Sequence, residues 1–229
     1  MSQTVIPVPA PTLLPVRGGG AFPVRRIYCV GRNFADHAKE MGAAVDRGNP
    51  VFFMKPGDAI VAGGGAVPYP PGTQDLHHEV ELVVALGRDA DGVVPVDGAG
   101  ALVFGYGVGL DLTRRDLQAN AKAKGLPWDT AKGFDHSAPC SELVPAGLTG
   151  DLAPRRLWLE VNGQPRQGAP LGDMVFSVAE VINALSKLFA LKAGDLVFMG
   201  TPAGVAALAQ GDRFHAGIEG LVELEGSIT

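Results

Sequence analysis

The segment from 78 to 86 reads His-Glu-Val-Glu-Leu-Val-Val-Ala-Leu and predicts a β-strand whose two faces differ. Residues two apart on a strand point to the same side, so Glu79 and Glu81 project together while Val80 and Leu82 face the other way. Beyond the two glutamates the same face continues in apolar side chains. Such a face suits a strand that runs from a covered core into the mouth of a cavity.

A second strand, predicted from 102 to 112, has glycine at alternate positions. Gly105, Gly107 and Gly109 leave one face of this strand without side chains, so another backbone or a ligand can approach it closely. By the same alternation Asp111 lies on the bare face. An aspartate in that position is a better candidate for function than one placed at random.

Other segments carry clear signals of regular structure. Ser177 and Glu180 form a capping box ahead of apolar residues at helical spacing, which predicts an amphipathic helix to Phe189. The Asn162-Gly163 pair predicts a hairpin turn after a strand. Further predicted elements are strands at 27–30, 51–55, 157–161 and 196–199, and helices at 33–41 and 113–124 that stop at Gly42 and Gly125. Glycine and proline predict turns at 63–72 and a loop at 204–220.

This order of elements predicts an α+β fold, β-rich and dominated by mixed sheet, with few short helices, because strands are many and no regular βαβ alternation occurs. A chain of 229 residues can form one such domain. Residues 1–22 are rich in proline and end near three glycines, so we expect an extended arm, laid on the body or partly disordered, with regular structure only after it. Residues 23–229 are expected to form a single catalytic domain.

Composition excludes several classes of partner. The formal charge is −5 and no basic cluster occurs, which argues against nucleic acid but leaves a small anionic substrate open. No apolar stretch reaches the ~20 residues that a membrane-spanning helix needs. The first residues lack a basic start and contain prolines, so no signal peptide is expected and a cytoplasmic location is the default.

The two cysteines do not suggest redox or nucleophilic chemistry. Cys29 lies in an apolar run and Cys140 follows Pro139, with no CxxC pair and no positioned base beside either. We expect Cys29 to pack as a small apolar side chain.

The carboxylates at 79 and 81 repel each other unless a cation lies between them, and a hard divalent ion is the usual solution. A charged strand end in water is the alternative reading of the same two residues. Asp111 completes a set of three carboxylates, which suits octahedral Mg²⁺ or Mn²⁺ with positions left for water and substrate.

Two pairs of polar residues lie three apart on predicted helices. His37 and Glu40 have the spacing at which a carboxylate orients an imidazole, so the pair is either a water-activating base or a surface ion pair. Arg115 and Gln118 share a face of the helix after Asp111, where an arginine can hold a substrate carboxylate.

Lys132 is flanked by small residues and either neutralises a developing enolate or is simply solvated. The turn 200–204 follows a buried strand and can offer N–H groups and the Thr201 hydroxyl to an anion. His77, His136 and His215 have no comparable partner in the sequence.

Taken together, these pieces resemble the fumarylacetoacetate hydrolase family in its short form, which lacks an extra N-terminal domain. The stretches that carry the resemblance follow one another from about residue 23 to the C-terminus. They are Tyr-Cys-Val-Gly-Arg-Asn-Phe-Ala-Asp-His-Ala-Lys-Glu at 28–40, His-Glu-Val-Glu-Leu at 78–82, Gly-Leu-Asp-Leu-Thr-Arg-Arg-Asp at 109–116, Ala-Lys-Gly-Phe-Asp at 131–135 and Gly-Thr-Pro-Ala-Gly-Val at 200–205.

The resemblance implies a homodimer with the family's β-rich fold and a catalytic Mg²⁺ or Mn²⁺ on Glu79, Glu81 and Asp111. It also implies a water-activating pair of His37 and Glu40. The remaining implied residues are Lys132 in catalysis and Arg32, Arg115, Gln118 and Thr201 in substrate binding. One departure from many relatives is Ala206, where they have glycine, so the loop after Thr201 is expected to differ in shape.

The family cleaves carbon–carbon bonds in β-diketo acids. Among its members the chain looks most like acylpyruvate hydrolases such as the fumarylpyruvate hydrolase of gentisate breakdown, a route of aromatic catabolism. Oxaloacetate decarboxylation and hydroxymuconate-type isomerisation are rivals, because both need only a metal-stabilised enolate. A carboxylate-binding protein without turnover is the rival outside enzymes, although a pure binder has no need of the His37–Glu40 pair.

Overall fold

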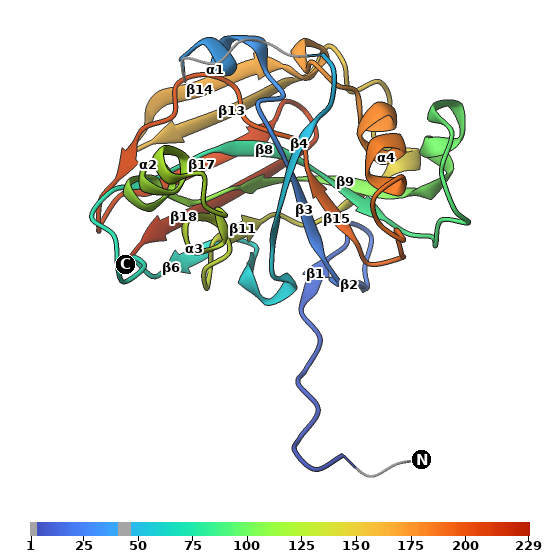
Figure 1. Cartoon of the computed structure of the whole chain (residues 1–229), viewed down its shortest axis with the longest axis horizontal. Coiled ribbons are helices and arrows are strands. Elements are labelled where there is room, and N and C mark those ends of the chain that lie inside the picture. Colours follow the sequence, from blue (N-terminus) through green and yellow to red (C-terminus); the bar gives the residue numbers. More distant parts are fainter. Residues whose placement is uncertain (1–3, 41–46) are drawn as a thin grey trace.

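Strands make up most of the regular structure of this chain, of which the computed structural model describes residues 4–40 and 47–229. The largest sheet is mixed, with the order β4-β3-β15-β8-β9-β11-β5 and β12 beside β9. Figure 1 labels most of its strands. Its strands are β3 (Ile27–Gly31), β4 (Val51–Lys55), β5 (Ile60–Ala62), β8 (Val80–Leu86), β9 (Val103–Leu110), β11 (Ala138–Cys140), β12 (Val144–Pro145) and β15 (Leu196–Phe198).

A five-stranded sheet of order β14-β13-β17-β18-β6 packs against the largest one. It contains β6 (Gly65–Val67), β13 (Arg156–Val161), β14 (Gln164–Pro170), β17 (Arg213–Ile218) and β18 (Val222–Ile228). A small sheet joins β7 (Leu76–His77), β10 (Thr113–Arg114) and β16 (Ala207–Leu208), and β1 (Leu13–Pro15) pairs with β2 (Ala21–Pro23). The helices are short: α1 (Ala35–Glu40), α2 (Arg115–Lys124), α3 (Asp129–Lys132), α4 (Val178–Ser186) and 3₁₀ turns at 57–59, 96–102, 146–148 and 171–173. The α+β, β-rich prediction is thus confirmed.

The alternation predicted for β8 is confirmed by the two apolar clusters that its side chains join. Val80 and Leu82 belong to the cluster between the two large sheets. Val83 and Ala85, on the face of the glutamates, belong to the cluster on the other side. One strand therefore supplies both the core and, at its start, the acidic residues.

The bare face of β9 is closely covered, as its glycines predict. A Cβ on Gly109 would lie 2.7 Å from the Phe198 ring, and one on Gly107 would lie 3.0 Å from the Ser141 hydroxyl. The carbonyl of Val144 in β12 comes closer still to Gly105. Glycine is therefore needed for packing along most of β9, and Asp111 beyond its end is the one side chain on that face in a position to act.

Several predicted boundaries hold and some do not. The strands at 51–55 and 157–161, the Asn162-Gly163 hairpin and the capping box of α4 are confirmed. Helix α2 ends at Gly125, whose φ of 64° is left-handed, but it begins at Arg115 because Thr113 and Arg114 pair with β7. The predicted end of the helix at Met41 and Gly42 lies outside the described residues.

Three segments predicted to lack strands contain them. The turn region 63–72 includes β6, the loop 204–220 includes β16 and all of β17, and the arm includes β1 and most of β2. In each case a partner strand satisfies the backbone of a sequence that is poor in β-forming residues, as β18 does for β6. Before Leu13 the chain extends away from the body (Figure 1).

None of the described helices has the length and apolarity needed to cross a membrane. Both cysteines are buried in the smaller apolar cluster, and burial raises the pKa of the Cys140 thiol to about 12. Burial, followed by the charge of Asp111, raises that of Cys29 as well. The expectation that Cys29 packs as an apolar side chain is confirmed, and neither thiol is primed for nucleophilic attack.

Candidate metal centre and active site

Three buried carboxylates meet where β8 begins and β9 ends. Glu79 precedes β8, Glu81 lies within it, and Asp111 follows β9, all with at most 5% exposure. One oxygen from each lies within 4.8 Å of the others. The antiparallel pairing of β8 and β9 sets this geometry, because Glu81 lies opposite Gly109 and the Asp111 N–H donates to the Glu79 carbonyl.

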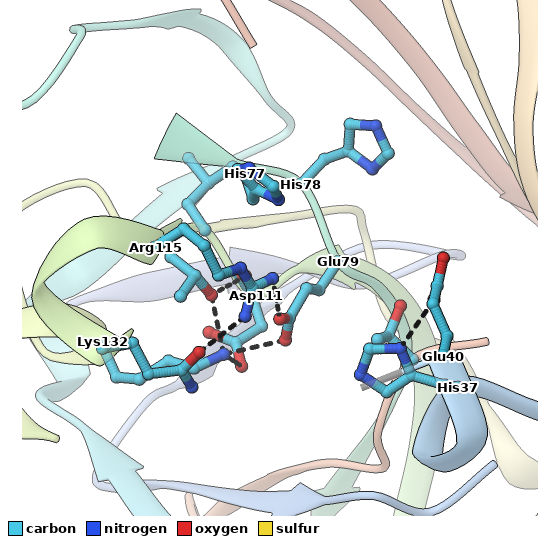
Figure 2. A network of polar contacts seen from close by, with 12 residues as sticks. His37, Glu40, His77, His78, Glu79, Asp111, Arg115 and Lys132 are labelled. Atoms are coloured by element: carbon cyan, nitrogen blue, oxygen red, sulfur yellow. Dashed lines mark hydrogen bonds and ion pairs between the residues drawn. The ribbon is translucent and has the colours of Figure 1, made fainter. Parts of the chain in front are cut away.

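Basic side chains surround two of the three carboxylates (Figure 2). The ammonium of Lys132, from α3, lies 2.8 Å from Glu79 Oε2 and 2.7 Å from Asp111 Oδ2, and it also donates to the Thr113 hydroxyl. The buried Lys55 ammonium is 2.8 Å from Asp111 Oδ1. Arg115 donates to Glu79 Oε1 at 2.6 Å.

These contacts shift the pKa values of Glu79 and Lys132 in opposite directions. Burial acts to raise the pKa of Glu79, but Lys132 and Arg115 outweigh it and hold that pKa below its ordinary range. Burial acts to lower the pKa of Lys132, but the carboxylates of Asp111 and Glu79 outweigh it and raise that pKa. Lys132 is therefore a fixed cation near neutral pH and not a proton acceptor.

Glu81 has the opposite environment. Burial, followed by the negative charges of Asp111 and Glu79, raises its pKa well above the ordinary value. One of its oxygens accepts from the Gly200 N–H at 2.7 Å, and no ammonium or guanidinium of the described residues forms an ion pair with it. Three converging hard oxygen donors, one of them from a carboxylate without an ion-pair partner in the described residues, fit a divalent ion such as Mg²⁺ or Mn²⁺. The residues present thus fit the metal that the sequence predicts.

Helix α1 carries His37 and Glu40, which lie beside the three carboxylates (Figure 2). Nδ1 of His37 is 3.2 Å from Glu40 Oε2, and the Glu40 carboxylate also accepts from the Gly204 N–H at 3.2 Å. The imidazole is nearly buried and lines the same pocket as the two glutamates. With Nδ1 facing Glu40, the other ring nitrogen is left for a water or substrate in the pocket.

The pocket brings together most of the residues predicted to form a site. Arg115 donates to Gln118 at 2.6 Å, so these two share a helix face as predicted. Arg32 lies at the mouth with a φ of 61°, an uncommon value for a residue with a side chain. The lining includes Arg32, His37, Glu79, Glu81, Arg115, Gln118, Lys132 and Thr201. Asp111 and Glu40 are not part of the lining. Asp111 is fully buried, and Glu40 contacts Nδ1 of His37.

Four further residues shape the site without a signal in the sequence. Lys55 ends an ordinary strand, and Lys122 joins the lining with its ammonium 5.3 Å from the centre of the Trp128 ring. Asn33 bonds both backbone groups of Phe176 and the carbonyl of Met199, which fixes the start of α1. Gln167 reaches the site from the other sheet. A buried lysine and a buried glutamine are recognisable only once burial is known.

Two of the histidines set aside in the sequence do have partners. His77 is 2.9 Å from the Asp75 carboxylate, and His215 is 3.0 Å from Glu223 on the neighbouring strand. Neither histidine lines the pocket, so these are local contacts.

Comparison with known proteins places this geometry in a family. Residues 26–229 match the sequence model for the C-terminal region of fumarylacetoacetate hydrolase. The mitochondrial oxaloacetate tautomerase FAHD1 of Rattus norvegicus is 46% identical over 200 residues, covering 87% of this chain and 90% of that protein. Two similar solved structures bear on the question of the reaction.

The first structure is the fumarylpyruvate hydrolase of Pseudomonas aeruginosa in complex with Mn²⁺ and pyruvate. It is 42% identical, with a TM-score of 0.93 and 99% of each chain covered. The second, from Burkholderia cenocepacia, is provisionally named a fumarylpyruvate hydrolase. It is 50% identical, with a TM-score of 0.92, 99% of this chain and 98% of that one covered.

Proposed function

Because this chain belongs to the fumarylacetoacetate hydrolase family, we propose that it is a metal-dependent hydrolase of acylpyruvates. The reaction adds water across the carbon–carbon bond of a 2,4-dioxo acid and yields pyruvate and a carboxylic acid. The observation that carries this proposal is the His37–Glu40 pair beside three buried carboxylates in one pocket. Hydrolysis needs both a base for water and a site that stabilises an enolate, and this pocket supplies residues for each.

Glu79, Glu81 and Asp111 would hold the metal, with Mg²⁺ and Mn²⁺ as the candidates. When bound, the ion supplies Lewis-acid stabilisation of negative charge on the 2-oxo acid end of the substrate. Arg115, Gln118 and Thr201 line the same pocket and would offer hydrogen-bond donors to the substrate carboxylate. That the Pseudomonas enzyme was solved with both Mn²⁺ and pyruvate supports a site that takes a divalent ion together with a 2-oxo acid.

His37 accepts a proton from water as the water oxygen attacks the distal carbonyl carbon, and Glu40 stabilises the imidazolium that forms. The bond between that carbon and its neighbour on the pyruvate side then breaks, and its electron pair passes into the pyruvate enolate. Lys132 remains protonated and offsets the negative charge that develops. The proton that His37 took from water is then returned to the enolate carbon, which completes pyruvate and restores the neutral imidazole.

The charges around the pocket favour a substrate with a second carboxylate. The lining carries four basic residues, Arg32, Arg115, Lys122 and Lys132, against two glutamates. Arg115 and Lys132 are paired with carboxylates, whereas Arg32 and Lys122 have no carboxylate partner in the described part of the chain. An acyl group that ends in a carboxylate, as in fumarylpyruvate, would pair with these two cations.

A second reaction is favoured by the relationship to the rat oxaloacetate tautomerase. Tautomerisation, or decarboxylation, of oxaloacetate passes through an enolate but uses no attacking water, so it would draw on the same carboxylates and Lys132. The test is a panel of acylpyruvates and oxaloacetate with Mg²⁺, with products identified and a chelator control. Pyruvate and the matching acid in equal amounts support the hydrolase, whereas turnover of oxaloacetate alone supports the alternative.

We also propose a cytoplasmic location and a role in aromatic catabolism, where such diacids arise.

A further inference from the structure

Gln167 occupies a special place in the five-stranded sheet. It lies on β14 at a point where the register with β13 shifts, with Leu159 opposite Gln167 and Glu160 opposite Pro165. Such a bulge re-aims side chains, and here it sends Gln167 inward to 5% exposure while its neighbours 164–166 stay exposed. A strand of the second sheet therefore reaches the turn that carries Thr201.

Four hydrogen bonds fix the orientation of the Gln167 amide. Oε1 accepts from the Val80 N–H at 3.1 Å and contacts His78 Nδ1 at 2.9 Å. Nε2 donates to the Pro202 carbonyl at 2.7 Å and to Thr201 Oγ1 at 2.8 Å. A backbone N–H only donates and a carbonyl only accepts. With the amide reversed, its NH₂ group would face the Val80 N–H and its oxygen would face the Pro202 carbonyl, so neither hydrogen bond could form.

This orientation determines what the Thr201 hydroxyl can do. Its oxygen already accepts from Gln167, and the described residues provide no acceptor for its hydrogen. Thr201 is buried and lines the pocket, so a ligand in the pocket is the acceptor that remains open to this hydrogen. The hydroxyl is thus a committed donor, suited to a carboxylate or oxo oxygen and unsuited to a donor group.

We propose that Gln167 is a positioning residue that holds Thr201 as a hydrogen-bond donor to the 2-oxo acid end of the substrate. Gln167 touches no substrate itself. The inference rests on the proposed function only in taking Thr201 as a substrate contact. It assigns to the second sheet a part in substrate recognition, since the amide also joins the start of β8 to the Thr201 turn.

The test is a double-mutant cycle with Gln167→Glu and Thr201→Val, read out by calorimetric binding of oxalate, a planar dianion like the 2-oxo acid end, to the Mg²⁺-loaded protein. A carboxylate at position 167 can only accept, so Thr201 would turn its hydrogen toward it and away from the ligand. We expect Gln167→Glu to weaken oxalate binding about tenfold, the scale of a hydrogen bond to a charged group. In the Thr201→Val background the same change should have less than about a twofold effect.

Two controls separate positioning from general damage. Gln164→Glu makes the same change on the exposed part of β14 and should bind oxalate like the parent. Thr201→Ser keeps the hydroxyl and should retain the sensitivity to Gln167→Glu. If Gln167→Glu does not fold, judged by near-UV circular dichroism, Gln167→Met takes its place in the cycle.

Losses that multiply in the double variant would overturn the proposal, as would parental oxalate binding by either variant of Gln167. The proposed function can fail separately. If the parent hydrolyses no acylpyruvate but the coupling in oxalate binding is present, the reaction assignment is wrong and the role of Gln167 stands.

Discussion

Glu81 differs from the other two carboxylates of the centre because nothing positive in the described residues is paired with it. Its charge is buried beside Asp111 and Glu79, and the one hydrogen bond that it accepts within the described residues comes from the Gly200 N–H. Glu79 and Asp111 are already paired with lysine and arginine. The unpaired carboxylate is thus the one that most requires a metal ion.

Replacing Glu81 by glutamine should have opposite effects on metal binding and on the metal-free protein. Without the third carboxylate, Mg²⁺ binding by calorimetry should be lost, and activity with it. The amide oxygen can still accept from Gly200, while the buried repulsion disappears, so the metal-free variant should melt about 2–4 °C above the parent, or roughly 1 kcal/mol. Glu219→Gln, an exposed control, should do neither. Parental Mg²⁺ affinity would refute the assignment.

Lys122 should determine the preference for diacids. With Lys122→Met, kcat/KM for fumarylpyruvate should fall roughly three- to fivefold more than that for acetylpyruvate, which has no distal carboxylate. Lys124→Met removes the same charge from the exposed end of α2, away from the pocket lining, and serves as the matched control. An equal fall for both substrates would remove Lys122 from recognition of the second carboxylate.

The residues that the sequence revealed are those with an informative local context. Glu79 and Glu81 lie two apart on a strand, and His37 and Glu40 three apart on a helix, so spacing alone indicated shared faces. Lys55 and Gln167 look ordinary in their strands, because their burial results from the packing of distant segments. Lys122 joins the site only because α2 is oriented with one face over the pocket.

The turn after β15 connects several elements of the site. Gly200 donates to Glu81 and Gly204 donates to Glu40, while Thr201 accepts from Gln167 of β14. This short segment therefore links α1, β8 and the second sheet. Its glycines have φ of 90° and 98°, which side chains rarely adopt.

Gly204→Ala should displace this turn and thereby impair the base. A Cβ there would collide with the Arg166 carbonyl, so the Gly204 N–H would move away from Glu40. We expect loss of roughly 2 kcal/mol of stability, from the left-handed φ and the collision, and a fall in kcat. Gly211→Ala has a similar φ of 91° but open space around it, and should lose stability alone. The comparison uses thermal unfolding and steady-state rates, and equal kcat in both variants would contradict this role.

Elements defined by local signals were predictable and those defined by distant pairing were not. The capping box fixed α4 and Asn162-Gly163 fixed the hairpin of β13 and β14. By contrast, β6 is a glycine-led segment that becomes a strand only beside β18, more than 150 positions later. The glycines that suggested a loop at 204–220 lie at the turns and within β17, whose pairing with β13 and β18 overrides them.

The N-terminal segment bears on the proposal that two copies of the chain associate. Val5, Ile6 and Val8 are 98%, 70% and 72% exposed on a segment that extends from the body. Exposed apolar side chains on an extended segment are stabilised when a second surface covers them. This arrangement supports the proposal of a homodimer in which the arm lies across a partner.

Light scattering coupled to size exclusion should give twice the 23.7 kDa chain mass at micromolar concentration. Removal of residues 1–11 should weaken the dimer, so that on dilution the shortened chain dissociates to monomers at a higher protein concentration than the full chain does. A monomeric full chain at every concentration would contradict the proposal.

Activation of water by His37 and Glu40 beside a metal-stabilised enolate is the central step of the proposed reaction. The direct measurement compares fumarylpyruvate hydrolysis with oxaloacetate turnover in the parent and in Glu40→Gln, after calorimetry shows that Mg²⁺ binding is intact. We expect hydrolysis to fall about 10²-fold or more, the scale for loss of a positioned base, and oxaloacetate turnover to fall by less than roughly tenfold. Equal losses in the two reactions, or hydrolysis at the parental rate, would contradict it.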